Sequence, residues 1–450
     1  MTRADKHILY ISKQYATMES AANIRCHLMV KALIANNYRV TLITAGKHPE
    51  IISENKYLTV ITLTANGVGP KRPPATNPLQ WPLLSVVPGP DADRPYLNST
   101  LQQAQNVIEA NKIDLIIASG PPFYLLAGAK LLAQHNNLPF IVELRDLWYH
   151  GVWWPYKHYL DAHSAKKHEA LCVKKAKGII TVTKISQDIL MHAYGSAKHD
   201  KFTTVRHGCP KEKPITTTAK NNHIFKIVYT GQLRGINIAN ESATKRLIKT
   251  CIHTILSVTI GKRRCHQLKV EWMSPHYLIE AMAMAAKELP ELKAHIQLTF
   301  AGESFKAIDQ WAVQHGLENQ IVQLGKLNAT DAQTLAMKSD LLMINLYGLI
   351  GPKKHWCIPS KIYNYLATGK PVLGLLPPGE AADILKEAKV GFICHPTNVK
   401  QISAQLINLY NQHRSGGIKL TPNQTYINTM SQSVQQKKYL TFIKSVLNTS

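Results

Sequence analysis

The sequence predicts an α/β protein with two successive parallel-sheet domains. Short apolar runs, typical of buried strands, alternate with stretches of helical periodicity along most of the chain. The alternation stops at a polar stretch, residues 211–223, and then begins again. The length of 450 residues is also too great for one ordinary hydrophobic core. We therefore expect one domain over residues 1–210 and another over residues 224–430.

The first domain opens with a strand, a loop, a helix and a second strand, which is the start of a doubly wound parallel sheet. A Pro- and Gly-rich stretch, residues 64–95, is expected to be a long irregular excursion that is either functional or merely tolerated. Buried strands are expected over residues 7–12, 40–44, 115–118, 140–144, 178–183 and 202–205.

The second domain repeats the same alternation. A basic segment, residues 236–272, interrupts it, and this insertion either contacts a membrane or partner or is simply solvated. Residues 431–450 carry a final helical pattern that is expected to pack back on the chain. Strands are expected over residues 225–230, 296–300, 321–324, 341–346, 372–376 and 391–394.

Residues 358–376 carry the strongest signal for a binding site. Ser360 is expected to cap a short helix with its hydroxyl, and Gly369 is expected to end that helix before a buried strand. Lys361 and Asn364 share the polar face. A helix N-terminus with an added lysine suits a nucleoside diphosphate, and Asn364 is placed to bond a ribose. The alternative is a capped amphipathic core helix with a solvated lysine.

Composition narrows the setting of the protein. The net charge of +25 indicates attraction to something anionic, such as a lipid surface, nucleic acid or phosphorylated substrates. Seven scattered cysteines without a CxxC pair indicate free thiols in a reducing compartment. No apolar segment is long enough for a signal peptide or membrane span. We therefore expect a cytoplasmic protein, peripheral at most on the inner face of a membrane.

Several motifs are missing from the sequence. The first loop lacks the GxGxxG fingerprint of dinucleotide-binding proteins, and there is no GxxxxGK[ST] motif, which disfavours phosphoryl transfer. No DxD-like motif stands in a suitable context, so no metal site is predicted. Nucleic-acid binding would account for the charge, but the usual aromatic-plus-basic motifs are absent, and nucleic acid is not expected as a partner.

Four stretches together resemble the retaining glycosyltransferases of the GT-B fold that use nucleotide sugars. They read FIVELRDLW, FKIVYTGQLRG, LTFAGES and PSKIYNYLATGKPVLG, in that order along the chain. The resemblance is to the family 4-like, group 1 enzymes that build cell-surface polysaccharides such as lipopolysaccharide. It implies two Rossmann-like domains facing across a cleft. The N-terminal domain would bind a glycan or lipid-linked acceptor at an anionic membrane surface. The C-terminal domain would bind a nucleotide-sugar donor, and a UDP-sugar is the donor we expect.

The resemblance also implies roles for single residues. Asp146 would orient or deprotonate the acceptor hydroxyl, while Arg234 and Lys361 would neutralise the leaving diphosphate without a metal or other cofactor. His207 is expected to be structural, and Glu143 to be paired in the core. The remaining residues expected to contact substrate are Ser360, Asn364, Arg145, Gly231 and Glu380.

Two positions depart from the family pattern. Asn364 and Trp356 stand where relatives usually carry a pair of glutamates, and an amide bonds a hydroxyl less strongly than a carboxylate does. A catalytically weakened binding module with the same fold is therefore an alternative to an active transferase. A nucleotide-sugar epimerase or an inverting transferase of the same fold is a second alternative, which fits residues 359–373 less well.

Overall fold

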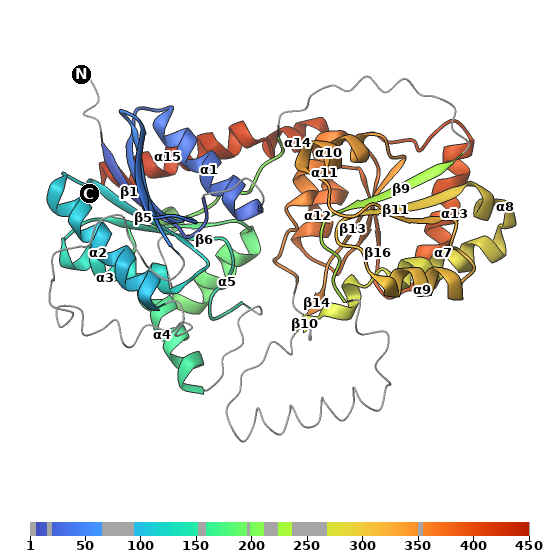
Figure 1. Ribbon diagram of the computed structural model, residues 1–450, viewed down its shortest axis with the longest axis horizontal. Coiled ribbons are helices and arrows are strands. Elements are labelled where there is room, and N and C mark those ends of the chain that lie inside the picture. The colour runs from blue at the N-terminus through green and yellow to red at the C-terminus, as the bar shows by residue number, and fades with distance from the viewer. Residues whose placement is uncertain are drawn as a thin grey trace. The chain divides into compact units, whose positions relative to one another are not determined.

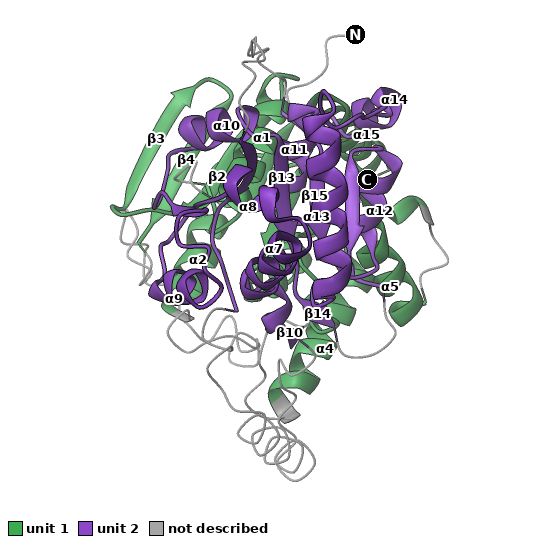
Figure 2. Cartoon of the chain, turned by 90° about the vertical axis from the view of Figure 1, so that its right-hand side faces the viewer, with its two compact units in different colours: residues 1–207, 257–265, 433–450 green, residues 208–256, 266–432 purple. Residues whose placement is uncertain are grey.

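The computed structural model describes residues 6–15, 20–64, 94–151, 159–195, 199–210, 224–235, 268–349 and 354–449. These residues form two units (Figure 2): unit 1 takes the described residues of 1–207 and 433–450, and unit 2 those of 208–432. Each unit has a sheet dominated by parallel strands, so the predicted fold class is confirmed. The excursion at 64–95 and the insertion at 236–272 lie almost wholly outside the described residues.

Unit 1 is built on an eight-stranded sheet in the order β3-β4-β2-β1-β5-β6-β7-β8. Figure 1 labels its central strands β1, β5 and β6. All neighbouring strands are parallel except β3, which is antiparallel to β4. The strands are β1 (His7–Ile11), β2 (Arg39–Ala45), β3 (Glu50–Asn55), β4 (Leu58–Leu63), β5 (Leu115–Gly120), β6 (Phe140–Leu144), β7 (Gly178–Thr181) and β8 (Phe202–Thr204).

Two strands of this sheet were not predicted. Every residue of β3 is exposed, so this edge strand has no buried alternate positions from which a strand could be recognised. Its neighbour β4 buries almost all of its residues but follows β3 through a tight turn. The other six strands of unit 1 occur where the sequence predicts them, within one or two residues at each end.

Helices cover both faces of the unit 1 sheet. On one face α1 and α15 pack against the central strands (Figure 1). Tyr439 and Ile443 of α15 are fully buried there. On the other face α2 and α3 pack against each other and against the sheet. The helices of unit 1 are α1 (Ala21–Ile34), α2 (Arg94–Ala110), α3 (Tyr124–His135), α4 (Tyr159–Lys175), α5 (Lys184–Tyr194) and α15 (Gln432–Asn448).

Unit 2 has a six-stranded, wholly parallel sheet in the order β12-β11-β9-β13-β15-β16. The sequence predicts all six strands. They are β9 (Phe225–Thr230), β11 (Ile296–Ala301), β12 (Ile321–Gln323), β13 (Leu341–Asn345), β15 (Val372–Leu375) and β16 (Gly391–Cys394). A separate antiparallel pair joins β10 (Leu268–Lys269) to β14 (Gly348–Leu349).

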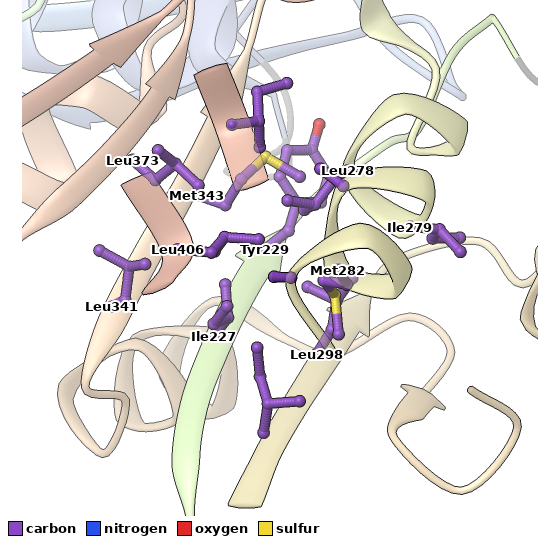
Figure 3. Packing of buried hydrophobic residues seen from close by; sticks show 14 of the residues in the cluster. Ile227, Tyr229, Leu278, Ile279, Met282, Leu298, Leu341, Met343, Leu373 and Leu406 are labelled. Carbon is purple, nitrogen blue, oxygen red and sulfur yellow. The ribbon is translucent and has the colours of Figure 1, made fainter. Parts of the chain in front are cut away.

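The core of unit 2 lies between this sheet and α7, α9 and α13. Figure 3 shows Leu278 and Met282 of α7 packed over Ile227, Leu298 and Met343 of the strands. The opposite face carries α10, α11 and α12. The helices are α7 (His276–Glu288), α8 (Pro290–His295), α9 (Lys306–Gln314), α10 (Ala329–Met337), α11 (Lys361–Thr368), α12 (Glu380–Glu387), α13 (Val399–Arg414) and α14 (Gln424–Thr429).

Two further observations bear on the setting of the protein. No helix in the described ranges is both long and apolar enough to cross a membrane. None of the described cysteines, Cys26, Cys172, Cys209, Cys357 and Cys394, forms a disulfide.

The docking of α15 should contribute strongly to the stability of unit 1. Replacing Ile443, which is fully buried, with alanine should lower the free energy of unfolding by about 2–5 kcal/mol, because it leaves a cavity against the sheet. Lys444→Ala, one residue further along and exposed, should change it by less than about 0.5 kcal/mol. Urea denaturation measures both. Equal losses in the two variants would show that α15 does not contribute to this core.

Candidate functional site

Lys361 lies at the start of α11, where its ammonium group is fixed by a tyrosine of a neighbouring strand. Lys361 Nζ donates to Tyr229 Oη at 3.0 Å and lies 4.4 Å from the centre of the same ring. Tyr229 is the penultimate residue of β9, and its hydroxyl donates in turn to the carbonyl of Gln232 at 2.9 Å. Because the phenol proton is used on Gln232, the phenol oxygen is left to accept from the lysine.

Glycines follow directly on two adjacent strands beside this lysine. Thr230 and Ala301 are the last paired residues of β9 and β11, so Gly231 and Gly302 lie next to each other at the carboxyl edge of the sheet. Gly231 has φ +120°, and a Cβ there would overlap Cε and Nζ of Lys361. A Cβ on Gly302 would overlap the Gly231 carbonyl oxygen. Only glycine at both positions lets the backbone and the ammonium approach this closely.

A second tyrosine fixes the end of β9. The hydroxyl of Tyr365, one turn along α11 from Lys361, bonds the backbone N–H of Thr230 at 3.1 Å and lies 3.2 Å from its side-chain hydroxyl. Tyr365 is fully buried, and burial raises the pKa of its phenol. The helix and the strand are therefore joined at Tyr229 and Thr230, the last two residues of β9 before Gly231.

Positive charge gathers at this turn. Burial lowers the pKa of Lys361, and the nearby Arg234 guanidinium lowers it further against the opposing effect of Tyr365. Arg234 itself is exposed, four residues after the end of β9. Two cations held close together repel each other, and an anion between them would offset that repulsion. The arrangement is thus suited to a negatively charged ligand.

The helix start differs from the prediction at Ser360. The predicted side-chain cap is wrong: Ser360 has helical backbone angles, and its hydroxyl makes no capping hydrogen bond. The first turn instead closes through backbone bonds, from Ile362 to the Pro359 carbonyl and from Tyr363 to the Ser360 carbonyl. Gly369 ends the helix in the left-handed conformation, as predicted.

Asn364 lies on the exposed face of α11, one turn after Lys361. The rest of the helix turns inward, with Ile362, Tyr363, Tyr365 and Leu366 buried. The amide of Asn364 is therefore accessible on the side of the helix opposite to the core. Binding of substrate by Ser360 and Asn364 stays a prediction.

Glu380 and Trp356 lie around the start of α12. Glu380 is buried, and its backbone N–H donates to the His355 carbonyl at 3.0 Å. Trp356 is 5% exposed, and its ring stacks on His355 with centroids 5.9 Å apart. The indole that stands where relatives usually carry a glutamate thus packs in the interior of unit 2.

In unit 1, Arg145 and Asp146 follow directly on β6. The Arg145 guanidinium donates to Ser119 Oγ at 2.7 Å and to the Pro121 carbonyl oxygen, so it braces the loop after β5. Asp146 is partly buried; burial raises the pKa of its carboxyl, while Arg145 opposes the rise. The two residues thus differ, since Arg145 is bonded within the fold and Asp146 has a carboxyl that is more readily protonated than usual.

Glu143 is paired in the core, as predicted, and its partner is Arg25 of α1. Arg25 contacts the carboxylate at 2.7 Å, and the Tyr10 hydroxyl donates to it at 2.9 Å. Burial raises the pKa of Glu143, but Arg25 and a hydrogen bond from Ser119 outweigh burial and lower it. His207 lies close to this group, and burial lowers its pKa to about 3, so its ring is neutral near pH 7.

The loop after Asp146 is held by one buried carboxylate from α4. Glu169 accepts hydrogen bonds from the backbone N–H groups of Trp148 at 3.0 Å and Tyr149 at 2.8 Å. Its other oxygen lies 2.7 Å from His150 Nδ1 and also accepts from the Tyr194 hydroxyl at 2.7 Å. Four polar contacts to a single carboxylate fix the backbone that follows Asp146.

The predicted residues thus fall into two groups. In unit 2 the structure brings Gly231, Arg234 and Lys361 together at the carboxyl edge of the sheet, with Ser360 adjacent in sequence. In unit 1, Arg145 and Asp146 lie at the corresponding edge. Among the described residues, no group of three or more His, Cys, Asp or Glu side chains is placed to hold a metal ion.

Sequence reasoning missed the two tyrosines that position this group. Tyr229 and Tyr365 look like ordinary core residues, because the sequence contains no sign that their hydroxyls reach Lys361 and Thr230. The available signal was their spacing: one tyrosine lies two residues before Gly231, and the other lies four residues after Lys361, on the same side of the helix.

Family models match both halves of the chain. The model "Glycosyltransferase Family 4" matches residues 22–213, and "Glycosyl transferases group 1" matches residues 270–418. Together the two matches cover about three quarters of the chain. The chain belongs to the GT-B glycosyltransferases. No curated protein has a matching sequence.

Solved structures of this glycosyltransferase fold match along the whole chain. Anabaena HepE in complex with UDP and glucose has a TM-score of 0.53 at 14% identity, with 99% of each chain covered. The lipopolysaccharide outer core galactosyltransferase WaaB has a TM-score of 0.57 at 11% identity, covering 98% of this chain and 99% of WaaB. A putative UDP-N-acetylglucosamine 2-epimerase from Listeria monocytogenes has a TM-score of 0.52 at 14% identity. The match covers 99% of this chain and 98% of the epimerase. At these identities the likeness shows the fold alone.

The Arg25–Glu143 pair should make the glycosyltransferase sensitive to acid. Because the folded pKa of Glu143 is lowered, its contribution is present above the unfolded pKa and is lost as pH falls through the folded value. Arg25→Met leaves a buried carboxylate unpaired and should cost about 3–5 kcal/mol near pH 7. The difference from wild type should shrink towards acid pH, when Glu143 is protonated.

Urea denaturation from pH 3 to pH 8 measures this difference. The matched control is Arg39→Met, because Arg39 is exposed and contacts His7 and Asn111 rather than a buried carboxylate. A gap between Arg25→Met and wild type that is constant with pH would contradict the account.

Proposed function

We propose that this chain transfers a sugar from a nucleoside-diphosphate sugar, UDP-linked by preference, to a glycan or lipid-linked acceptor. The observation that carries the proposal is the pair of cations, Lys361 and Arg234, at the glycine turn where β9 ends. The solved structure of HepE with UDP, which has the same fold, supports a uridine nucleotide as the donor.

Lys361 and Arg234 have the chemistry that a leaving diphosphate requires. Negative charge grows on the diphosphate as the glycosidic bond breaks, and fixed cations stabilise it without having to reorganise. Tyr229 holds the Lys361 ammonium in place, and the start of α11 adds the partial positive charge of a helix N-terminus. We infer that these groups neutralise the diphosphate, so that no divalent ion is required for its departure.

Asp146 is the acceptor-side residue of the proposal. It follows β6 at the carboxyl edge of the unit 1 sheet, where open α/β sheets bind ligands. Its raised pKa favours exchange of a proton with an acceptor hydroxyl. The firm attachment of the following loop to Glu169 keeps this carboxyl in a defined position. Transfer with retention of configuration is part of the proposal and rests on the family.

A cell-surface glycan is the proposed product, and the inner face of a membrane the proposed place of synthesis. The net charge of +25 favours an anionic lipid surface, and a lipopolysaccharide galactosyltransferase shares the fold. A weakened binding module remains the second candidate, because buried Trp356 and neutral Asn364 replace the usual glutamate pair. Turnover of a UDP-sugar to free UDP would exclude that candidate.

Lys361→Ala should abolish most binding of UDP. Loss of a cation from the diphosphate site should weaken the affinity about tenfold to a hundredfold, because hydrogen bonds to charged groups contribute about 1.5–3 kcal/mol. Lys370→Ala, just past the other end of α11, is the matched control and should bind UDP like wild type. The shift of the melting temperature with UDP measures both variants. Equal shifts in the two variants would remove Lys361 from the site.

Gly231→Ala tests the close approach itself. The added methyl group would overlap Lys361 Nζ and should displace the ammonium, so UDP binding should fall as far as in Lys361→Ala. Gly325→Ala has a similarly positive φ of +73° but open space around it, so it adds backbone strain without moving the lysine. Isothermal titration with UDP distinguishes them. Normal UDP binding by Gly231→Ala would contradict the proposed position of the diphosphate.

A further inference from the structure

An open groove of about 470 Å³ lies in unit 1 between α15 and the edge strand β8. We call it the α15 groove. The groove has no part in the proposed sugar transfer: Asp146 follows β6, whereas the groove lies beside β8 and the helix that returns from the C-terminus. The residues from α15 that line it include Val434, Lys437, Lys438 and Phe442, and β8 contributes Phe202.

The floor of the groove is apolar. Phe202 and Phe442 are both buried, and the Phe442 ring packs against the backbone of Gly178 in β7. Val434 stands at the rim with 43% of its surface exposed, one of six large hydrophobic side chains that stand exposed in the described part of the chain. An open apolar floor with an exposed valine beside it suits a ligand that contains hydrocarbon.

The rim of the groove is positively charged. Lys437 and Lys438 follow each other on α15, which contains no aspartate or glutamate anywhere along its length. Burial lowers the pKa of Lys438, and Arg206 and Lys184 lower it further. Of these neighbours, Lys184 contacts Asp188 at 2.6 Å. Cations gathered at one rim repel one another, and an anionic ligand would relieve that repulsion.

We propose that the α15 groove binds an anionic phospholipid at a membrane surface, with the phosphate between Lys437 and Lys438 and hydrocarbon against Phe202 and Phe442. A free phosphate would use the lysines but leave the apolar floor exposed, whereas a phospholipid uses both. The inference deepens the proposed function, because it names the surface through which a transferase with a lipid-linked acceptor would meet the membrane.

Flotation with vesicles tests the inference. Wild type should bind phosphatidylglycerol–phosphatidylcholine vesicles but not pure phosphatidylcholine. The double variant Lys437→Glu/Lys438→Glu should lower the affinity for the anionic vesicles at least about thirtyfold. Each basic residue near the surface contributes about fivefold to that affinity. Val434→Ser should also weaken binding, because it removes an apolar contact without changing charge.

The control variant must separate a local site from diffuse attraction. Lys326→Glu/Lys400→Glu makes the same change of net charge on exposed positions of unit 2, and it should lower vesicle binding by less than fivefold. The inference is overturned if both double variants lose binding equally, or if wild type does not bind anionic vesicles. It is also overturned if glycerol phosphate displaces the vesicles, which would indicate a small-anion site. A groove variant that binds vesicles like wild type but no longer binds a protein partner would overturn it too.

A UDP melting shift measured on the same samples keeps the two proposals apart. The groove variant should retain the wild-type shift, which also shows that it is folded. Loss of vesicle binding with a retained UDP shift supports the groove. Retained vesicle binding in the groove variant, with a normal UDP shift, overturns the groove while leaving the donor site intact.

Discussion

The contact between the Lys361 ammonium and the backbone of Gly231 is the constraint on which the edge of the unit 2 sheet depends. It requires a residue without a side chain at φ +120°, a second glycine on the adjacent strand, and a tyrosine that accepts a hydrogen bond from the lysine. Tyr365 then joins the same helix to the end of β9. The glycine backbone at position 231, the two buried tyrosines and the charge of Lys361 therefore depend on one another at this turn.

In unit 1, the carboxyl edge of the sheet contains a buried carboxylate that needs a compensating charge. Glu143 is buried under the site and would be costly there without a cation, so α1 supplies Arg25 and β1 supplies the Tyr10 hydroxyl. With Arg145 tied to the loop after β5, the charged groups beneath the edge are satisfied within the fold. Asp146 is left partly buried at the surface with a raised pKa, in a loop that Glu169 fixes.

Most of the fold follows from the sequence, because a buried parallel strand is a short apolar run and the strands of unit 2 have this form. The strand β3 could not be found in this way, since its residues are exposed and only its pairing with β4 makes it a strand.

At the site, Lys361 and Gly231 are visible as residues of a motif, but their contact is not. It depends on Tyr229 and Tyr365, whose hydroxyls are positioned by tertiary packing rather than by local pattern. The Ser360 cap was wrong for a related reason: the backbone N–H groups of Ile362 and Tyr363 donate to the Pro359 and Ser360 carbonyls and close the first turn of α11 without the hydroxyl.

The turn after β9, with Gly231 beside Lys361, is the proposed diphosphate site. A crystal structure of the wild-type protein grown with UDP tests it most directly. We expect diphosphate oxygens within hydrogen-bonding distance of Lys361 Nζ and the Arg234 guanidinium, next to Gly231 and Gly302. A nucleotide bound elsewhere, with Lys361 still bonded only to Tyr229, would contradict the claim and leave the two cations without the role assigned to them.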